Sequence, residues 1–225
     1  MYPAFFILLR SPKGYRAANR LRQLWACLLF LLTGIVPVIT YRAQIDRRRN
    51  YVFCSNHFSY LDIPLAALVA GPSWRFLAKA ELNNIPLLNI FFRTVDISVD
   101  RENAWESFQS YQESLRSVDH GLNLVVFPEG RISPKAPQLF PFKNGPFRLA
   151  IEKQVPIVPL TMLDNWRLLR VEGWRIEGRP GVARIIVHEP IETQGLTPAD
   201  APQLRQRVFD LLAHDLKQAN PQIRL

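Results

Sequence analysis

Two residues of this chain have the types and the spacing that general-base chemistry needs. His57 and Asp62 both lie in the segment Ser55–Asp62, which reads SNHFSYLD. On one helix, five residues turn through about 500°, so the two side chains would not face each other there. In a loop that folds back, the carboxylate would fix the imidazole tautomer and leave the second ring nitrogen free to accept a proton. The same spacing also fits a loop histidine followed by an aspartate that caps a helix.

A second polar cluster, Pro128–Ser133 (PEGRIS), follows the apolar run Leu122–Phe127. Pro-Glu-Gly suits a tight turn, and a solvent-facing glutamate is common in such a turn, so Glu129 alone does not define a site. Four isolated cations are each typical of a solvated surface, but they could hold a phosphate if they converged. They are Lys79, Arg101, Arg131 and Lys143.

Other catalytic signatures are absent from the sequence. It contains no G-x-S-x-G, no H-E-x-x-H, no G-x-x-x-x-G-K-[ST] and no G-x-G-x-x-G. His120, His188 and His214 lack metal-ligand spacing, so we expect ordinary surface or core residues and no metal site. Cys27 and Cys54 lie in apolar runs and do not indicate a disulfide framework.

The elements that must position these residues alternate along the chain. The 225 residues are 48% hydrophobic, which is enough for one domain with a full core. Short apolar runs predict strands at 51–54, 74–78, 96–99, 122–127, 157–162 and 182–188, and longer stretches predict helices at 64–70, 102–119, 147–153 and 204–216. This order predicts an α/β fold with a mostly parallel central sheet flanked by helices. Both polar clusters then follow strands, where ligands of open α/β sheets bind.

The basic charge of the chain is concentrated near its start. The net charge is +9, and residues 1–50 contain nine basic side chains and one acidic one. Residues 24–41 carry no charge, and as a helix they would be about 27 Å long, slightly short of a hydrocarbon core. Pro37 is expected to kink or end that helix. The later segment 166–181 has no clear period and fits a surface loop or a hairpin.

The apolar run has several interpretations. A cleaved signal peptide fits poorly, because the run begins late and no small-residue cleavage site follows it. Basic residues flank it on both sides, so the positive-inside rule gives a single spanning helix no clear orientation. A segment that dips into the anionic cytoplasmic leaflet accounts for this symmetry, while an ordinary core helix and a nucleic-acid surface fit less well. We expect residues 1–45 to form a membrane-associating helical segment, interfacial or single-pass, on the cytoplasmic face of the cell membrane.

Taken in order, six blocks of the chain resemble the glycerolipid acyltransferase family, and the lysophosphatidic acid acyltransferases in particular. Asn56–Asp62 matches the N-H-x-x-x-x-D block, and Val125–Ser133 matches the F-P-E-G block. The other four blocks are Leu77–Leu88 (LAKAELNNIPLL), Ile97–Arg101 (ISVDR), Pro141–Phe147 (PFKNGPF) and Val155–Leu160 (VPIVPL).

The resemblance implies an O-acyltransferase of phospholipid biosynthesis, with residues 46–225 as the acyltransferase domain. It implies transfer of a fatty acyl group from acyl-CoA or acyl-carrier protein to the free hydroxyl of 1-acyl-sn-glycerol 3-phosphate, with phosphatidic acid as the product. His57 would be the base and Asp62 its support, and no cofactor, metal or nucleic acid is expected. The acceptor and its phosphate would be held by Arg101, Glu129, Gly130, Arg131 and Lys143.

Some positions depart from the family pattern and bear on the acceptor. The usual block reads F-P-E-G-T-R-S, whereas here Arg131 takes the Thr position and Ile132 the Arg position. Related acyltransferases that act on other lysophospholipids also resemble F-P-E-G-R-I. Asn89 and Asp96 stand where members often have Gly. The alternatives are an acyltransferase for another lysophospholipid or an amino-acid lipid, a thioesterase, and a membrane scaffold with a degenerate site.

Overall fold

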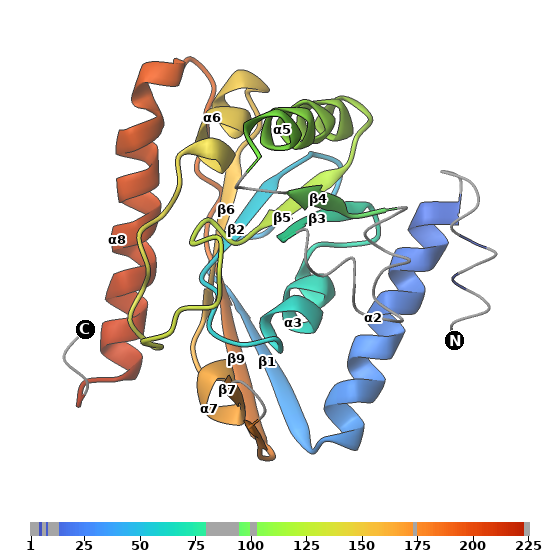
Figure 1. Cartoon of the computed structure of the whole chain (residues 1–225), viewed down its shortest axis with the longest axis vertical. Coiled ribbons are helices and arrows are strands. Elements are labelled where there is room, and N and C mark those ends of the chain that lie inside the picture. Colours follow the sequence, from blue (N-terminus) through green and yellow to red (C-terminus); the bar gives the residue numbers. More distant parts are fainter. Residues whose placement is uncertain are drawn as a thin grey trace.

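The computed structural model describes residues 14–79, 95–99, 103–172 and 175–222, together with residues 5 and 8. Helices and strands alternate along most of this length (Figure 1). In chain order they are α2 (Tyr15–Leu32), β1 (Ile35–Tyr41), β2 (Val52–Ser55), α3 (Asp62–Val69), β3 (Trp74–Lys79), β4 (Ile97–Val99), α5 (Ala104–Asp119), β5 (Asn123–Val126), α6 (Gly145–Glu152), β6 (Ile157–Met162), α7 (Asn165–Leu168), β7 (Leu169–Glu172), β8 (Arg175–Gly178), β9 (Gly181–Val187), the 3-10 turn Pro198–Asp200 and α8 (Ala201–Ala219).

The described strands form a seven-stranded sheet and a separate two-stranded hairpin. The strand order of the sheet is β1-β9-β6-β2-β5-β3-β4. Every pair of neighbours is parallel except β6 and β9, which are antiparallel. The predicted α/β fold with a mostly parallel sheet is therefore confirmed. The segment 166–181, predicted as a loop or a hairpin, contains α7 and the hairpin of β7 and β8.

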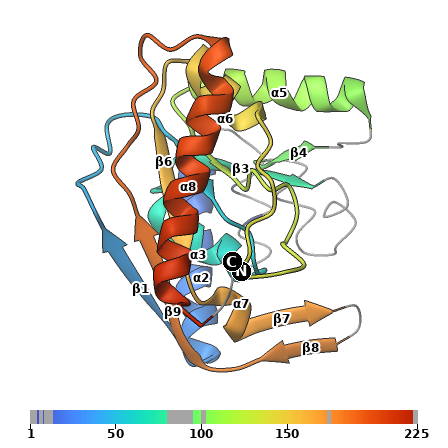
Figure 2. The same cartoon turned by 90° about the vertical axis from the view of Figure 1, so that its left-hand side faces the viewer.

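Helices cover both faces of the sheet (Figures 1 and 2). One core lies between the sheet and the pair α2 and α3, and a second lies between the sheet and α5, α6 and α8. Side chains on β2 alternate between them, since Phe53 belongs to the first core while Val52 and Cys54 belong to the second. This period of two is the geometry of a strand that is buried on both faces.

The helix predicted over the N-terminal apolar run is wrong beyond Leu32. The chain turns at Gly34, whose φ is 67°, and Ile35–Tyr41 then pairs with β9 as a parallel strand. Five of these seven residues are β-branched, which favours a strand over a helix. Pro37 is tolerated because β1 is an edge strand with one partner. Part of the central sheet therefore lies within residues 1–45.

A buried ion pair fastens α2 to the sheet. The Arg22 guanidinium donates to both Asp96 carboxylate oxygens, at 3.2 and 2.7 Å, and its carbon lies 4.1 Å from the centre of the Trp74 ring. Asp96 also accepts the backbone N–H of Phe76 at 3.0 Å. Asp96 thus holds the N-terminal helix against the sheet. In the part of the chain that the structure describes, no helix has both the length and the apolar content to cross a bilayer.

Candidate active site

Three loops meet where adjacent parallel strands end. Strand β2 lies between β5 and β6, and all three run in the same direction. The loop after β2 carries His57, the loop after β5 carries Glu129, and the segment after β6 carries Asn165. The register of the sheet thus brings together residues that are far apart in the sequence, at the edge where α/β folds bind ligands.

The carboxylate of Asp62 organises the turn that carries His57. Asp62 Oδ2 accepts the backbone N–H groups of Phe58 and Ser59 at 2.6 and 2.8 Å. The same oxygen lies 3.0 Å from His57 Nδ1. The loop therefore folds back, and Asp62 both closes the turn and contacts the imidazole, which combines the two interpretations of the spacing. With three neighbours that donate to it, this oxygen selects the tautomer that carries its proton on Nδ1.

The second oxygen of Asp62 is held by a residue that the sequence did not single out. Asn165 Nδ2 donates to Asp62 Oδ1 at 2.7 Å, and both side chains are fully buried. Asn165 is the first residue of α7, 103 positions from Asp62. In the sequence, only its place shortly after the predicted strand 157–162, next to Asp164, could have indicated a functional role for Asn165. The carboxylate is thus fixed at both oxygens.

The imidazole of His57 lies flat against an aromatic ring. Its ring centre is 4.1 Å from that of Phe127, with 16° between the planes, and Phe127 stacks in turn on Phe76. The His57 side chain is 13% exposed. No hydrogen bond to Nε2 is formed within the described residues, which leaves this nitrogen available for a substrate proton. Phe127 was predicted only as a strand residue, and its stacking role was missed.

Glu129 joins the His57 loop to the loop after β5. Its two carboxylate oxygens accept the backbone N–H groups of His57 and Phe140, each at 2.7 Å. Ser133 N also donates to the His57 carbonyl at 2.8 Å. The side chain is 1% exposed, and burial raises the pKa of Glu129 to about 8, although the two N–H donors lower it. Glu129 is thus a buried bridge between the two loops and not a solvent-facing turn residue.

The remaining predicted acceptor residues lie in different surroundings. Gly130 has a φ of 75°, which a glycine adopts without strain. Arg131 is exposed, with its guanidinium carbon 5.4 Å from the centre of the Phe140 ring. Lys143 is also exposed, and its backbone N–H closes the loop by donating to Pro128 O at 2.9 Å. Arg101 lies outside the described residues, as does the predicted Leu77–Leu88 block from residue 80 onward.

A second histidine–aspartate pair is buried in the core under α8. His188 Nε2 lies 2.9 Å from Asp215 Oδ2, and Thr161 Oγ1 contacts both groups at 2.9 and 3.0 Å. All three side chains are at most 8% exposed. This network joins β6, the residue after β9 and α8, and it agrees with the expectation that His188 is an ordinary core residue.

Comparison with known proteins places this geometry in a family. A family model described as Acyltransferase matches residues 38–163, more than half of the chain. The protein therefore belongs to the acyltransferase family.

Individual relatives point the same way. An uncharacterized acyltransferase of Schizosaccharomyces pombe is 31% identical over 74% of this chain and 62% of its own length. A chloroplastic 1-acyl-sn-glycerol-3-phosphate acyltransferase of Brassica napus is 30% identical over 83% of this chain, which spans 54% of that relative. A 1-acyl-sn-glycerol-3-phosphate acyltransferase of Haemophilus influenzae is 24% identical over 97% of this chain and 88% of its own length. The chain thus spans about half to two thirds of the first two relatives.

One solved structure has the same fold. The crystal structure of the 1-acyl-sn-glycerophosphate acyltransferase PlsC from Thermotoga maritima superimposes with a TM-score of 0.79, covering 99% of this chain and 88% of the other. The two sequences are 22% identical. The match shows that the α/β architecture is shared.

Proposed function

We propose that the protein transfers a fatty acyl group from a thioester to the free hydroxyl of 1-acyl-sn-glycerol 3-phosphate, forming phosphatidic acid. The observation that carries this proposal is the His57 imidazole, held through Nδ1 by Asp62 and open at Nε2. Family membership supports acyl transfer, and the names of the plant and bacterial relatives support this acceptor.

In the proposed reaction, His57 Nε2 removes the proton of the acceptor hydroxyl as its oxygen attacks the thioester carbonyl. The tetrahedral intermediate then expels the thiolate. The imidazolium gives the proton that it took from the acceptor hydroxyl to this thiolate, which leaves as the thiol. Asp62 stabilises the imidazolium that forms between these steps, while Asn165 keeps the carboxylate in place. The acceptor hydroxyl is itself the nucleophile, so no acyl-enzyme forms. General-base assistance of this kind typically contributes about 10²–10⁴-fold.

The donor in this proposal is acyl-CoA or acyl-carrier protein, and no cofactor takes part. The acceptor phosphate is bound by cations near the loop after β5, with Arg101, Arg131 and Lys143 as the candidates. Arg131 and Lys143 are both exposed, which suits a charged headgroup that arrives from a lipid surface. Glu129 and Gly130 contribute by shaping that loop.

The test is an assay of the purified protein with each donor and a panel of lysolipids. We expect transfer to lysophosphatidic acid, and His57→Ala should lower turnover by at least about 100-fold with the circular dichroism spectrum unchanged. Turnover close to wild type would remove His57 from the mechanism. Preferred transfer to another lysolipid would instead identify the alternative acceptor class, and release of free fatty acid would identify a thioesterase.

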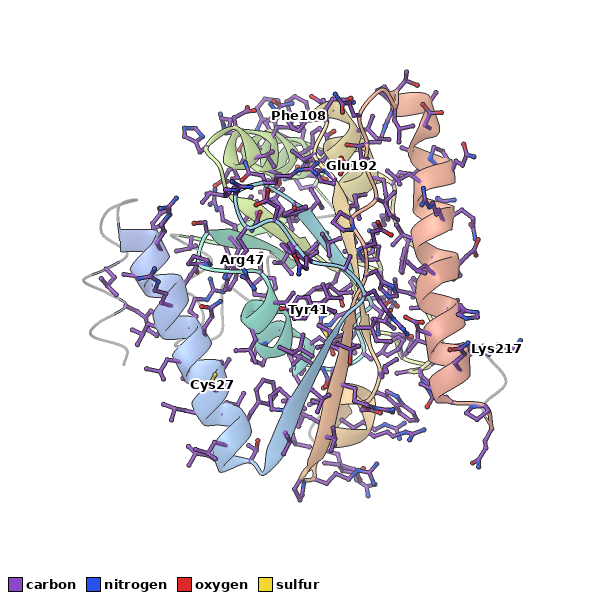
Figure 3. All side chains as sticks on the ribbon, turned by 180° about the vertical axis from the view of Figure 1, so that it is seen from behind. Cys27, Tyr41, Arg47, Phe108, Glu192 and Lys217 are labelled. Carbon is purple, nitrogen blue, oxygen red and sulfur yellow. The ribbon has the colours of Figure 1, made fainter. Side chains whose placement is uncertain are left out.

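We further propose that α2 lies on the cytoplasmic face of the cell membrane. Its outward face carries a row of exposed apolar side chains, which Figure 3 shows pointing away from the body around the labelled Cys27. They are Leu24, Trp25, Leu28, Leu31 and Leu32. An apolar row on a helix with basic neighbours is typical of segments that lie in the interface of an anionic bilayer.

Point substitutions test this membrane contact without disturbing the sheet, whereas deletion of residues 1–45 would also remove β1. The double variant Leu28→Ser/Leu31→Ser should bind phosphatidylglycerol vesicles at least about tenfold more weakly than wild type, because it removes two aliphatic side chains that would be buried in the bilayer. Phe108→Ser, on α5, is the matched control. Equal vesicle binding by the double variant and the control would place the contact elsewhere.

A further inference from the structure

The hairpin of β7 and β8 stands apart from the body of the molecule. Figure 2 shows it projecting sideways from the end of the molecule at which β9 begins. Among the described residues, its strands pair with each other and with no strand of the central sheet. Two-stranded hairpins are at best marginally stable alone in water. This hairpin is joined to the body at its base, where Leu169 packs against the first core.

The two faces of the hairpin differ in chemistry. On one face Val171 lies directly opposite Ile176, and these side chains are 38% and 71% exposed. On the other face, Arg170 lies opposite Glu177, and Arg175 forms an ion pair with Glu177 at 2.7 Å. The charged face is suited to water, whereas the exposed aliphatic pair has no evident role in an aqueous setting.

The base of the hairpin adjoins the end of α2. Gly181, which follows the hairpin, donates its N–H to Gly34 O at 3.2 Å, and Gly34 follows α2. Leu31 and Leu32, at the end of α2, are 74% and 83% exposed. The hairpin and the exposed end of α2 thus lie at the same end of the molecule (Figures 1 and 2).

The hairpin is also tied to the loop that carries His57. Ser59 Oγ donates to the carbonyl of Leu169, the first residue of β7, at 2.7 Å. One helical turn earlier, Asn165 holds Asp62. Ser59 also donates its backbone N–H to Asp62 Oδ2, which contacts His57 Nδ1. Two hydrogen bonds therefore link Ser59, the partner of the hairpin, to the proposed base.

We propose that the β7–β8 hairpin is a second bilayer-contacting element, which inserts Val171 and Ile176 among lipids with anionic headgroups and sets the His57 loop at that surface. This inference rests on the proposed function. The hairpin strands carry two arginines and two glutamates, and the exposed Arg167 and Arg179 flank them at the base. The excess positive charge at the base of the hairpin therefore complements an anionic surface. Exposed aliphatic side chains beside arginines are typical of elements that lie at the boundary between headgroups and acyl chains.

The experiment compares the full-length wild-type protein with three variants on vesicles with and without phosphatidylglycerol. Val171→Thr/Ile176→Thr keeps β-branched residues, and hence the strand preference, while removing apolar surface. We expect its partitioning to phosphatidylglycerol vesicles to fall at least about tenfold, with a matching loss of acyl transfer to vesicle-borne acceptor. Transfer to a short-chain lysophosphatidic acid dissolved as monomers should stay within about twofold of wild type, because the His57 site is intact. Ile176→Trp should tighten partitioning, and Phe108→Thr is the matched control.

Each result decides for or against the hairpin. Unchanged partitioning of the Thr/Thr variant overturns the inference, and so does a loss of acyl-carrier-protein binding without loss of vesicle binding. If the Thr/Thr variant does not fold, Ile176→Trp decides, and partitioning no tighter than wild type overturns the inference. If the wild-type protein transfers no acyl group but the Thr/Thr variant still leaves the vesicles, the proposed function fails while the bilayer contact stands.

Discussion

Replacement of Asp62 by asparagine removes one negative charge beside His57 while keeping the shape of the side chain. An asparagine whose oxygen takes the Oδ2 position keeps the acceptor of all three bonds made there. Its amide nitrogen then faces Asn165, whose own Oδ1 has no partner among the described residues. Rotation of the Asn165 amide turns this meeting of two donors into a hydrogen bond. We therefore expect Asp62→Asn to fold.

The size of the catalytic loss follows from the lost charge. Since His57 Nδ1 and Asp62 Oδ2 are 3.0 Å apart, the centres of the two delocalised charges are roughly 4 Å apart. At an effective dielectric constant of about 20, that attraction amounts to about 4 kcal/mol, available only when the imidazolium forms. With a factor of ten for each ~1.4 kcal/mol, turnover should fall about 1000-fold.

The assay follows thiol release from acyl-CoA with saturating lysophosphatidic acid, alongside thermal unfolding of each protein. Asp119→Asn removes an exposed carboxylate that pairs with Lys153 and serves as the matched control. A folded Asp62→Asn protein with turnover within tenfold of wild type would refute the support of about 4 kcal/mol worked out above, since tenfold corresponds to only ~1.4 kcal/mol. An equal loss in Asp119→Asn would show that the effect is not local to the site.

Three further outcomes concern stability. Because the native pKa of Glu129 is about 8, above its ordinary value of 4.5, the folded state binds more protons and loses stability as pH rises. Urea unfolding should show about 3 kcal/mol less stability at pH 7.5 than at pH 5 from this group, and Glu129→Gln should remove that part of the slope; parallel slopes would contradict the burial argument. Arg22→Ala leaves Asp96 buried without its partner and should cost about 3–5 kcal/mol, and a change below 1 kcal/mol would mean that the pair does not fasten α2. Gly130→Ala forces a positive φ on a residue with a Cβ and should cost about 1–3 kcal/mol in the same assay, whereas Gly145→Ala, at a position with open space around a Cβ, should be nearly neutral.

Periodicity along the chain predicted most of the sheet and its covering helices, because strands buried on both faces leave apolar runs such as Ile157–Met162. It failed at Leu24–Tyr41, where apolar character is continuous although the backbone changes at Gly34. The change from Leu-rich to β-branched composition at that glycine was the available signal. Pro64 was expected to open its helix, but α3 begins at Asp62 because the carboxylate there closes the preceding turn.

The site was only partly predictable for a different reason. His57 and Asp62 are close in the sequence, so a local turn is enough to bring them together. The bonds from Asn165 to Asp62 and from Glu129 to His57 and Phe140 depend on the order of β5, β2 and β6 in the sheet. Residue spacing carries no information about that order. Arg101 stays a prediction, since it lies outside the described residues.

The direct passage from α2 into β1 has a consequence for how the protein would work on a lipid surface. Only Thr33 and Gly34 separate the helix from the sheet, and Arg22 fixes the same helix to Asp96. A helix joined in this way cannot swing on a tether. If its apolar row rests in the bilayer as proposed, the rigid join between helix and sheet fixes the height of His57 Nε2 above the headgroups. Lipid hydroxyls at that height would be acylated, and those buried deeper or standing higher would be passed over.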